Sequence, residues 1–92
     1  MLKVEHRRSS IEIIAHILRY GEAGKTEIMY GVNMSYFQVN RYLNFLLKQE
    51  FLHKAITGDE HAIYRITQKG RKLLQDVETV LEMLQEKELI NI

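Results

Sequence analysis

Hydrophobic and polar positions near the start of the chain repeat with the period of an α-helix. The apolar residues that follow Ser9 and Ser10 are spaced i, i+3, i+4 and i+7, and they are Ile11, Ile14, Ala15 and Leu18. Serine commonly caps helices because its hydroxyl accepts a hydrogen bond from a free backbone amide. The pattern therefore predicts a first helix that follows these serines and ends at Tyr20-Gly21.

Capping signals predict two further helices. Thr26 is predicted to cap a short helix from Glu27 to about Val32, and Asn33 can take the left-handed conformation of a tight turn. The segment Ser35-Tyr36-Phe37-Gln38 is an S-x-x-Q capping box, in which the serine and glutamine side chains satisfy free amides reciprocally. It opens a third helix that is expected to reach about Gln49.

After the third helix the period changes to two. Leu52–Ile56 and Ala62–Ile66 have strand composition, and the Gly58-Asp59 region between them supplies a hairpin turn. Thr67 then caps a last helix of roughly two dozen residues. The predicted order is helix, helix, turn, helix, hairpin and long helix, with no internal repeat.

The stretch from Tyr64 to Leu74 joins the hairpin to the last helix. It contains an alternating strand, a capping threonine, a basic turn and then leucines. This sequence predicts a mainly α (α+β) fold, a winged helix-turn-helix with a short β-hairpin wing and a long C-terminal coiled-coil helix. Residues 1–66 are expected to form the body and residues 67–92 a dimerisation helix, within one structural domain.

Short segments over nearly the whole chain carry a family resemblance: Ile14…Ile17-Leu18, Lys25-Thr26-Glu27-Ile28, Met34-Ser35-Tyr36, Tyr42-Leu43…Leu46-Leu47, Phe51-Leu52 and Tyr64-Arg65-Ile66-Thr67…Gly70…Leu73-Leu74. They resemble archaeal winged-helix regulators, in particular the crenarchaeal ten-kilodalton DNA-binding chromatin proteins of the "a" class. The resemblance implies a dimer in which the last helix pairs with its twin as an antiparallel coiled coil. Glu50 departs from the pattern, since many relatives carry glycine there; either Glu50 is left-handed and strained, or the helix exit differs.

The third helix has two chemically different sides. At 100° per residue, Val39, Leu43, Leu46 and Leu47 share one side, and the opposite side carries Phe37, Arg41, Asn44, Phe45 and Lys48, flanked by Gln38 and Asn40. Arginine can fork onto guanine, asparagine or glutamine can pair with adenine, and an aromatic ring can meet a thymine methyl. This side therefore suits a DNA major groove, with a solvated helix face as the alternative. For Phe45 we expect packing against a neighbouring element rather than base contact.

Cations around the third helix are expected to contact phosphates. Lys25 and Arg7-Arg8 lie near predicted helix N-termini, whose partial positive charge favours anions. On the hairpin, the strands rather than the tip should contact the DNA backbone, because Asp59 and Glu60 at the tip would repel its phosphates. The predicted DNA-binding residues are Arg7, Arg8, Lys25, Ser35, Phe37, Gln38, Asn40, Arg41, Asn44, Lys48, Lys54, His61 and Arg65.

The last helix carries an apolar seam of the coiled-coil type. Leucines and valines are spaced 4, 3 and 4 along it and are widened by two more leucines. Part of this seam can pack on the first helix, but the remainder would be exposed in a monomer. We therefore predict a homodimer interface made by Leu73, Leu74, Val77, Val80, Leu81 and Leu84. Acidic residues towards one end and basic residues at the other favour an antiparallel pair.

The net charge of +1 is divided unevenly along the chain. Residues 76–92 contain five acidic residues and one lysine, which gives −4, and the remaining 75 residues contain twelve Lys or Arg and seven Asp or Glu, which gives +5. A basic body and an acidic last helix suggest different partners for the two parts.

Other chemistry has little support in the sequence. The absence of cysteine excludes a disulfide framework and a thiolate metal site, and the four histidines lack zinc-ligand spacing. The Gly-Lys-Thr at 24–26 follows a helix rather than a strand, so a turn explains it better than a nucleotide site. We expect no enzyme activity, cofactor, metal, small-molecule ligand or membrane segment, and a cytoplasmic, nucleoid-associated location.

The sequence thus predicts a homodimer that binds duplex DNA through the helix Ser35–Gln49 with supporting wing contacts, as a transcriptional regulator or a chromatin protein. The alternative is a winged-helix module that docks a protein partner without binding DNA. The near-neutral total charge and the aromatic residues Phe37 and Phe45 favour that alternative.

Overall fold

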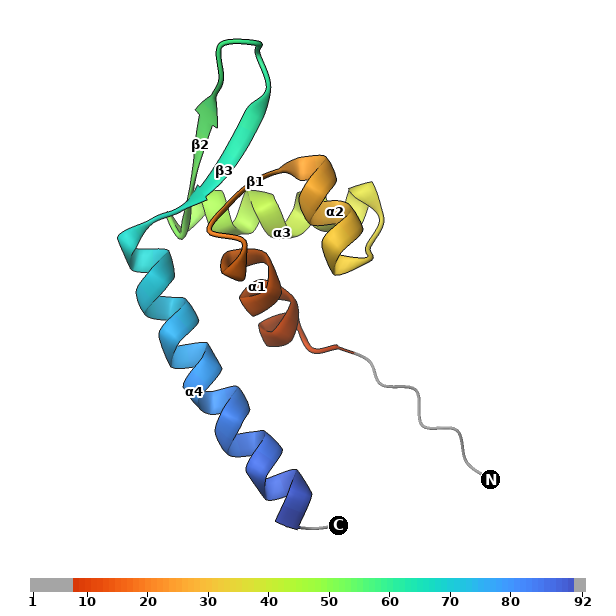
Figure 1. Cartoon of the computed structure of the whole chain (residues 1–92), viewed down its shortest axis with the longest axis vertical. Coiled ribbons are helices and arrows are strands. Elements are labelled where there is room, and N and C mark those ends of the chain that lie inside the picture. Colours follow the sequence, from red (N-terminus) through yellow and green to blue (C-terminus); the bar gives the residue numbers. More distant parts are fainter. Residues whose placement is uncertain (1–7, 91–92) are drawn as a thin grey trace.

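A computed structural model describes residues 8–90 of the chain, with side chains described for residues 8–84. Along the chain it contains α1 (Ser10–Arg19), β1 (Glu22–Gly24), α2 (Lys25–Val32), α3 (Tyr36–Lys48), β2 (Leu52–Ile56), β3 (Ala62–Ile66) and α4 (Gln68–Ile90). The hairpin of β2 and β3 projects from the three-helix body on one side, and α4 runs away from the body on the other (Figure 1). The predicted winged helix-turn-helix fold is confirmed, and both predicted strands have the bounds read from the sequence.

The sheet contains a strand that the sequence did not predict. β1 pairs with β3 in antiparallel fashion, and β3 also pairs with β2, so the strand order is β1-β3-β2. β1 has three residues, too few for an alternating pattern to be recognised, and its partner lies some forty positions further along the chain. β1 closes one edge of the wing and ties the end of α1 to the base of the hairpin.

The core side of α1 is broader than the predicted stripe. Ile13 and Ile17 are 7% and 2% exposed, whereas Ile11, which was placed in the stripe, is 48% exposed. α1 packs against α2 on one side and α4 on the other, so its buried arc covers more than one helical stripe. The prediction for Ile11 was therefore wrong, while Ala15 and Leu18 are buried as expected.

The start of α2 also differs from its prediction. The helix begins at Lys25 with Gly24 at the N-cap, and no side chain caps it, so the cap assigned to Thr26 was wrong. The reason is that β1 extends through Gly24 and leaves the chain in extended geometry there. At the other end, Asn33 adopts the left-handed conformation that the sequence predicted, with φ of 55°.

α3 is held at both ends by local hydrogen bonds. The Ser35–Gln38 capping box forms as predicted, and Val39, Leu43 and Leu46 are completely buried beneath the helix. At the exit, Phe51 N–H donates to the Leu46 carbonyl at 2.8 Å and Glu50 N–H donates to the Leu47 carbonyl at 3.0 Å, which is the Schellman arrangement. Glu50 has φ of 64°, so of the two alternatives for this position the left-handed one is observed.

Thr67 connects the end of α3 to the start of α4. Its hydroxyl accepts from Gly70 N–H at 2.9 Å, as a helix cap should, and donates to the Glu50 carbonyl at 2.7 Å. Gly70 lies so close to the chain after α3 that a Cβ there would overlap the Phe51 carbonyl oxygen and lie 2.9 Å from Ile66 Cγ1. A glycine at this position lets α4 approach the base of the wing.

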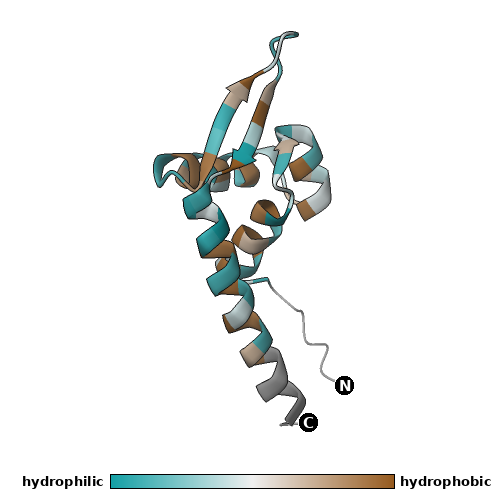
Figure 2. Cartoon of the chain, turned by 60° about the vertical axis from the view of Figure 1, so that its left-hand side comes forward, coloured by the Kyte–Doolittle hydropathy of each residue, from teal (hydrophilic) through white to brown (hydrophobic). Residues whose placement is uncertain are grey.

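α4 changes its environment along its length. Leu73 and Leu74 are partly buried against the core, and the Glu78 carboxylate lies 3.4 Å from the Arg19 guanidinium of α1. Beyond this point Val80 and Leu84 are 46% and 56% exposed. Apolar and polar residues alternate around the helix where it leaves the body (Figure 2). No described helix is both long and apolar enough to cross a membrane.

Replacing Gly70 with alanine should destabilise the fold. The added methyl group meets backbone rather than a movable side chain, so α4 must shift away from Phe51. Overpacking of this kind costs about 2 kcal/mol, which denaturant unfolding would measure as a lower free energy of unfolding. Gly58→Ala is the matched control, since its Cβ would meet nothing within 4 Å, and it should change stability by less than about 0.5 kcal/mol. Equal effects of the two substitutions would contradict the close approach at Gly70.

Candidate nucleic-acid interface

The outer side of α3 presents a line of exposed side chains. Phe37, Arg41, Asn44 and Lys48 follow one another at spacings of four, three and four residues, and all four are exposed. Phe37 is 71% exposed although it is apolar. Among the described residues, Arg41, Asn44 and Lys48 make no side-chain hydrogen bond and no ion pair, so their donors are available to a partner. We call these four residues the α3 stripe.

On one flank of the α3 stripe, Lys25 of α2 is bound to two residues of α3. Its ammonium donates to Asn40 Oδ1 at 2.8 Å and lies 4.9 Å from the centre of the Tyr36 ring. It also lies 3.4 Å from the Tyr36 hydroxyl. The predicted DNA-binding residues Lys25 and Asn40 are thus brought together, and each restrains the other.

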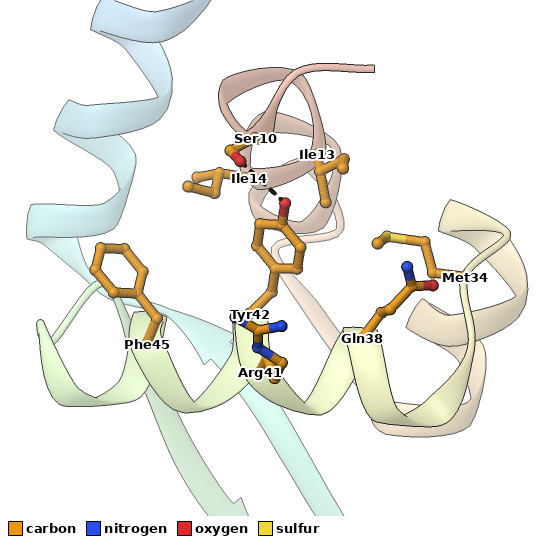
Figure 3. Close-up of a pocket in the computed structure, with 8 residues that line it drawn as sticks. All are labelled: Ser10, Ile13, Ile14, Met34, Gln38, Arg41, Tyr42 and Phe45. Carbon is orange, nitrogen blue, oxygen red and sulfur yellow. Dashed lines mark hydrogen bonds between the residues drawn. The ribbon is translucent and has the colours of Figure 1, made fainter. Parts of the chain in front are cut away.

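On the other flank, α3 faces α1 across an open hollow of about 510 Å³. Figure 3 shows Gln38, Tyr42 and Phe45 directed from α3 toward α1, where the Tyr42 hydroxyl donates to Ser10 Oγ at 3.2 Å. Gln38 Oε1 accepts from the backbone and hydroxyl of Ser35, at 3.3 and 3.2 Å. Phe45 lines the hollow and is 47% exposed, so it lies beside the stripe and near α1 rather than on the stripe itself.

The predicted hairpin cations do not share one surface. In the β2–β3 register Lys54 is paired with Tyr64, which faces the core, whereas Arg65 is paired with His53 on the opposite face. Arg65 Nε also donates to Glu22 Oε1 across to β1, which offsets its charge. Lys54 is the exposed cation on the helical side of the wing, 6.0 Å from the Tyr64 ring centre.

The wing tip is acidic as the sequence suggested. The hydrogen bond from the Thr57 hydroxyl is the main cause that lowers the pKa of Asp59, so this carboxylate is charged at neutral pH. His61 lies beside it, with 3.6 Å between His61 Nδ1 and Asp59 Oδ2, and is engaged locally. The Asp59 carboxylate beside His61 would repel a DNA phosphate and so opposes the predicted contact of His61 with DNA.

Arg8 lies against the body rather than free in solution. Its guanidinium donates to the Val32 carbonyl at the end of α2 and lies 3.1 Å from His16 Nδ1. Its partner in the predicted pair, Arg7, lies outside the described residues.

His16, which Arg8 contacts, also stacks on Tyr20, with ring centres 6.0 Å apart. Burial, and then the nearby charges of Arg8 and Arg19, lower the pKa of His16, which keeps the imidazole neutral and able to accept.

Two exposed aromatic residues were absent from the predicted set, and one of them, Tyr36, contacts the candidate residue Lys25. Tyr30 on α2 and Tyr36 on α3 are 76% and 60% exposed. Tyr30 is offset by two residues from the buried Ile28 and Val32, and this offset places it on the opposite side of α2. This spacing of Tyr30 from the apolar positions of α2 could have been recognised in the sequence.

Within residues 8–84, no three His, Asp or Glu side chains are grouped so that they could hold a metal ion.

The comparisons with known proteins agree with this geometry. A family model described as winged helix-turn-helix matches residues 7–85, so the chain belongs to the winged helix-turn-helix family. An uncharacterized protein of Methanocaldococcus jannaschii is 29% identical over 85 residues, which cover 89% of this chain and 82% of that protein. The family is therefore represented among archaea.

Solved structures share the fold over most of this chain. Sso10a-2, a DNA-binding protein from Sulfolobus solfataricus, superimposes with a TM-score of 0.82 and 29% identity, covering 91% of this chain and 90% of that one. The predicted resemblance to archaeal winged-helix DNA-binding proteins is thereby confirmed. The transcriptional regulator BldR from the same organism has a TM-score of 0.80 at 16% identity, covering 87% of this chain, which spans 61% of BldR; this likeness shows the fold alone.

The lowered pKa of His16 predicts a decline of stability in mild acid. The unfolded chain binds a proton at His16 near its ordinary pKa of 6.5, and the folded protein binds it more weakly. The free energy of unfolding should therefore fall as the pH drops below about 6.5, because protonation favours the unfolded state. His16→Gln should flatten this part of the pH profile in denaturant titrations. His53→Gln, on the exposed face of β2, should keep the decline, and a steep profile in His16→Gln would contradict the assignment.

Proposed function

We propose that this winged helix-turn-helix protein binds duplex DNA as a homodimer, with α3 in the major groove and α4 at the dimer interface, as a transcriptional regulator or a chromatin protein. The α3 stripe carries the proposal. It consists of Phe37, Arg41, Asn44 and Lys48 on one exposed line, while the opposite line of the same helix is completely buried. A rigid helix that offers unpaired donors is suited to base edges and phosphates.

The charges around the α3 stripe support a polyanionic partner. Arg41 and Lys48 are not neutralised by any described carboxylate, and Lys54 adds a cation on the helical side of the wing. The acidic side chains Glu78 and Asp76 lie instead on α4, each paired with a base there or on α1. DNA bound along α3 would thus meet positive charge, and the salt dependence of binding should be steep. Relatives of this fold include proteins described as DNA-binding, which supports the same reading.

The outer half of α4 supports dimerisation. Val80, Met83 and Leu84 are 46%, 59% and 56% exposed on a helix that extends past the body. Leu73 and Leu74 are partly buried within the chain, so the proposed interface relies mainly on the outer part of the predicted seam, with Val77 and Leu81 half-buried beside it. Apolar residues grouped on one exposed helix side commonly mark a helix–helix interface. An antiparallel pairing would place the acidic half of each α4 near the basic first turn of its twin.

The first test removes the two cations of the α3 stripe. Arg41→Ala combined with Lys48→Ala should lower the affinity for a mixed-sequence duplex at least about tenfold at low salt, because a base or phosphate contact is lost at each position. The slope of log affinity against log salt should become shallower by about 2. Fluorescence anisotropy at several salt concentrations would measure both quantities.

A matched double variant separates this effect from loss of charge alone. Arg71→Ala combined with Lys72→Ala removes the same charge from the first turns of α4 and should weaken binding far less. If Arg41 and Lys48 could be removed with no more effect than this control, α3 would not be the reading helix. If the wild-type protein bound no duplex even at low salt, the protein-docking alternative, which would use Phe37 and Phe45, would replace the DNA proposal.

The second test addresses the dimer. Val80→Glu combined with Leu84→Glu places two carboxylates in the proposed apolar interface, where their desolvation is unfavourable, and should give monomers in light scattering. Gln75→Glu combined with Thr79→Glu adds the same charges on exposed positions away from these residues and should leave the dimer intact. A dimer that persists in the first variant would refute the α4 interface.

A further inference from the structure

Two amide side chains beside the α3 stripe have their oxygen atoms already occupied. Asn40 Oδ1 accepts from the Lys25 ammonium at 2.8 Å. Gln38 Oε1 accepts from Ser35 N–H at 3.3 Å and from Ser35 Oγ at 3.2 Å. Neither amide nitrogen has a hydrogen-bond partner among the residues that the structure describes. Both residues therefore keep free N–H donors, while their acceptor oxygens are engaged within the chain.

The arrangement at Asn40 is reinforced on two sides. The Lys25 ammonium lies over the Tyr36 ring, 4.9 Å from its centre, so the cation is held by the ring as well as by Asn40. Asn40 is itself half-buried, and the contact between Lys25 and Asn40 is partly shielded from water. A charge-assisted hydrogen bond in such a setting is among the stronger ones in proteins.

Adenine and guanine present different hydrogen-bonding groups to such a donor in the major groove. Adenine is read by asparagine through a pair of bonds, in which the amide oxygen accepts from N6 and the amide nitrogen donates to N7. Asn40 Oδ1 already accepts from Lys25 on one of its two lone pairs, and the ammonium held 2.8 Å away repels the partly positive N6 amino group of adenine. The adenine pair is therefore disfavoured, and towards a base the amide acts as a donor, which we call donor-only. Guanine presents two acceptors side by side, N7 and O6, and no donor in the major groove, so a donor-only amide next to the Arg41 fork meets no repulsion there.

We propose that Lys25 is a positioning residue that makes Asn40 a donor-only contact, so that this flank of α3 selects guanine over adenine. This proposal rests on the proposed function, since it requires α3 to lie in a major groove. It assigns Lys25 a part in base choice, which differs from the phosphate contact that the sequence suggested for it. The equivalent restraint on Gln38 by Ser35 extends the donor-only character to the other flank.

The test begins with selection of binding sites by the wild-type protein from a random duplex pool. The expected site contains guanine at a defined position, and replacing that guanine by adenine, or by 7-deazaguanine, which lacks the N7 acceptor, should weaken binding about tenfold. Duplex binding at low salt without any guanine preference would overturn the proposal and leave the proposed function standing. Absence of binding to every duplex at low salt would overturn both.

Substitution of Lys25 then tests its role. Lys25→Met keeps the aliphatic chain beside Tyr36 but frees Asn40 Oδ1, so the preference for guanine over adenine should fall to near parity at one base pair. Asn40→Ala should lose the preference at the same base pair, and circular dichroism of both variants would confirm that they fold. Lys54→Met is the matched control, since it removes a cation that contacts no side-chain amide. It should lower the affinity for all duplexes by the same factor, whatever their sequence. If Lys25→Met behaved like Lys54→Met, Lys25 would be a phosphate contact and the positioning role would be wrong.

Discussion

The geometry of the domain depends on Thr67, because its hydroxyl group joins the exit of α3 to the first turn of α4. It donates to the Glu50 carbonyl just past the end of α3 and accepts from Gly70 N–H in the first turn of α4, at 2.7 and 2.9 Å. The Thr67 amide in turn donates to the Phe51 carbonyl at 3.1 Å. Since β3 ends at Ile66, this single residue fixes the exit of α3, the base of the wing and the direction of α4. The left-handed Glu50 is retained because both of its neighbouring carbonyls take part in this junction, with Lys69 Nζ donating to the Gln49 carbonyl at 2.9 Å.

Polar side chains on α3 are divided between those that hold the fold and those left for a partner. Gln38 and Asn40 fall between the two groups, since their oxygens bind Ser35 and Lys25 while their nitrogens stay free, and Arg41, Asn44 and Lys48 belong to the second. The acceptors available on this helix are therefore fewer than its polar composition suggests, while the donors remain available. The restrained residues are also already ordered, so a partner that used them would lose less side-chain entropy on binding.

The parts of this structure that follow from local signals could be predicted from the sequence, and the parts that depend on distant contacts could not. The strands Leu52–Ile56 and Ala62–Ile66, the Ser35 capping box and the Thr67 cap each depend on neighbours in the chain, and the structure contains all of them. β1 exists only because β3 offers it a free edge, and the pairing of Arg65 with Glu22 joins residues 43 positions apart. The same holds for the candidate site, because composition places Lys25 and Arg8 near helix ends but cannot show that Asn40 and Val32 already engage them.

The proposed dimer and the proposed groove contact are coupled through the junction at Thr67. α4 is anchored to the body by the partly buried Leu73 and Leu74, so its direction relative to α3 is set within each chain. Two copies joined through α4 would hold their α3 helices at one fixed separation, and two-fold dimers read half-sites that lie whole helical turns apart. The second α3 would then meet DNA at an effective concentration set by rigid helices rather than by diffusion. If both proposals hold, affinity for DNA would depend on residues such as Val80 and Leu84, although they lie on α4 and not on the α3 stripe.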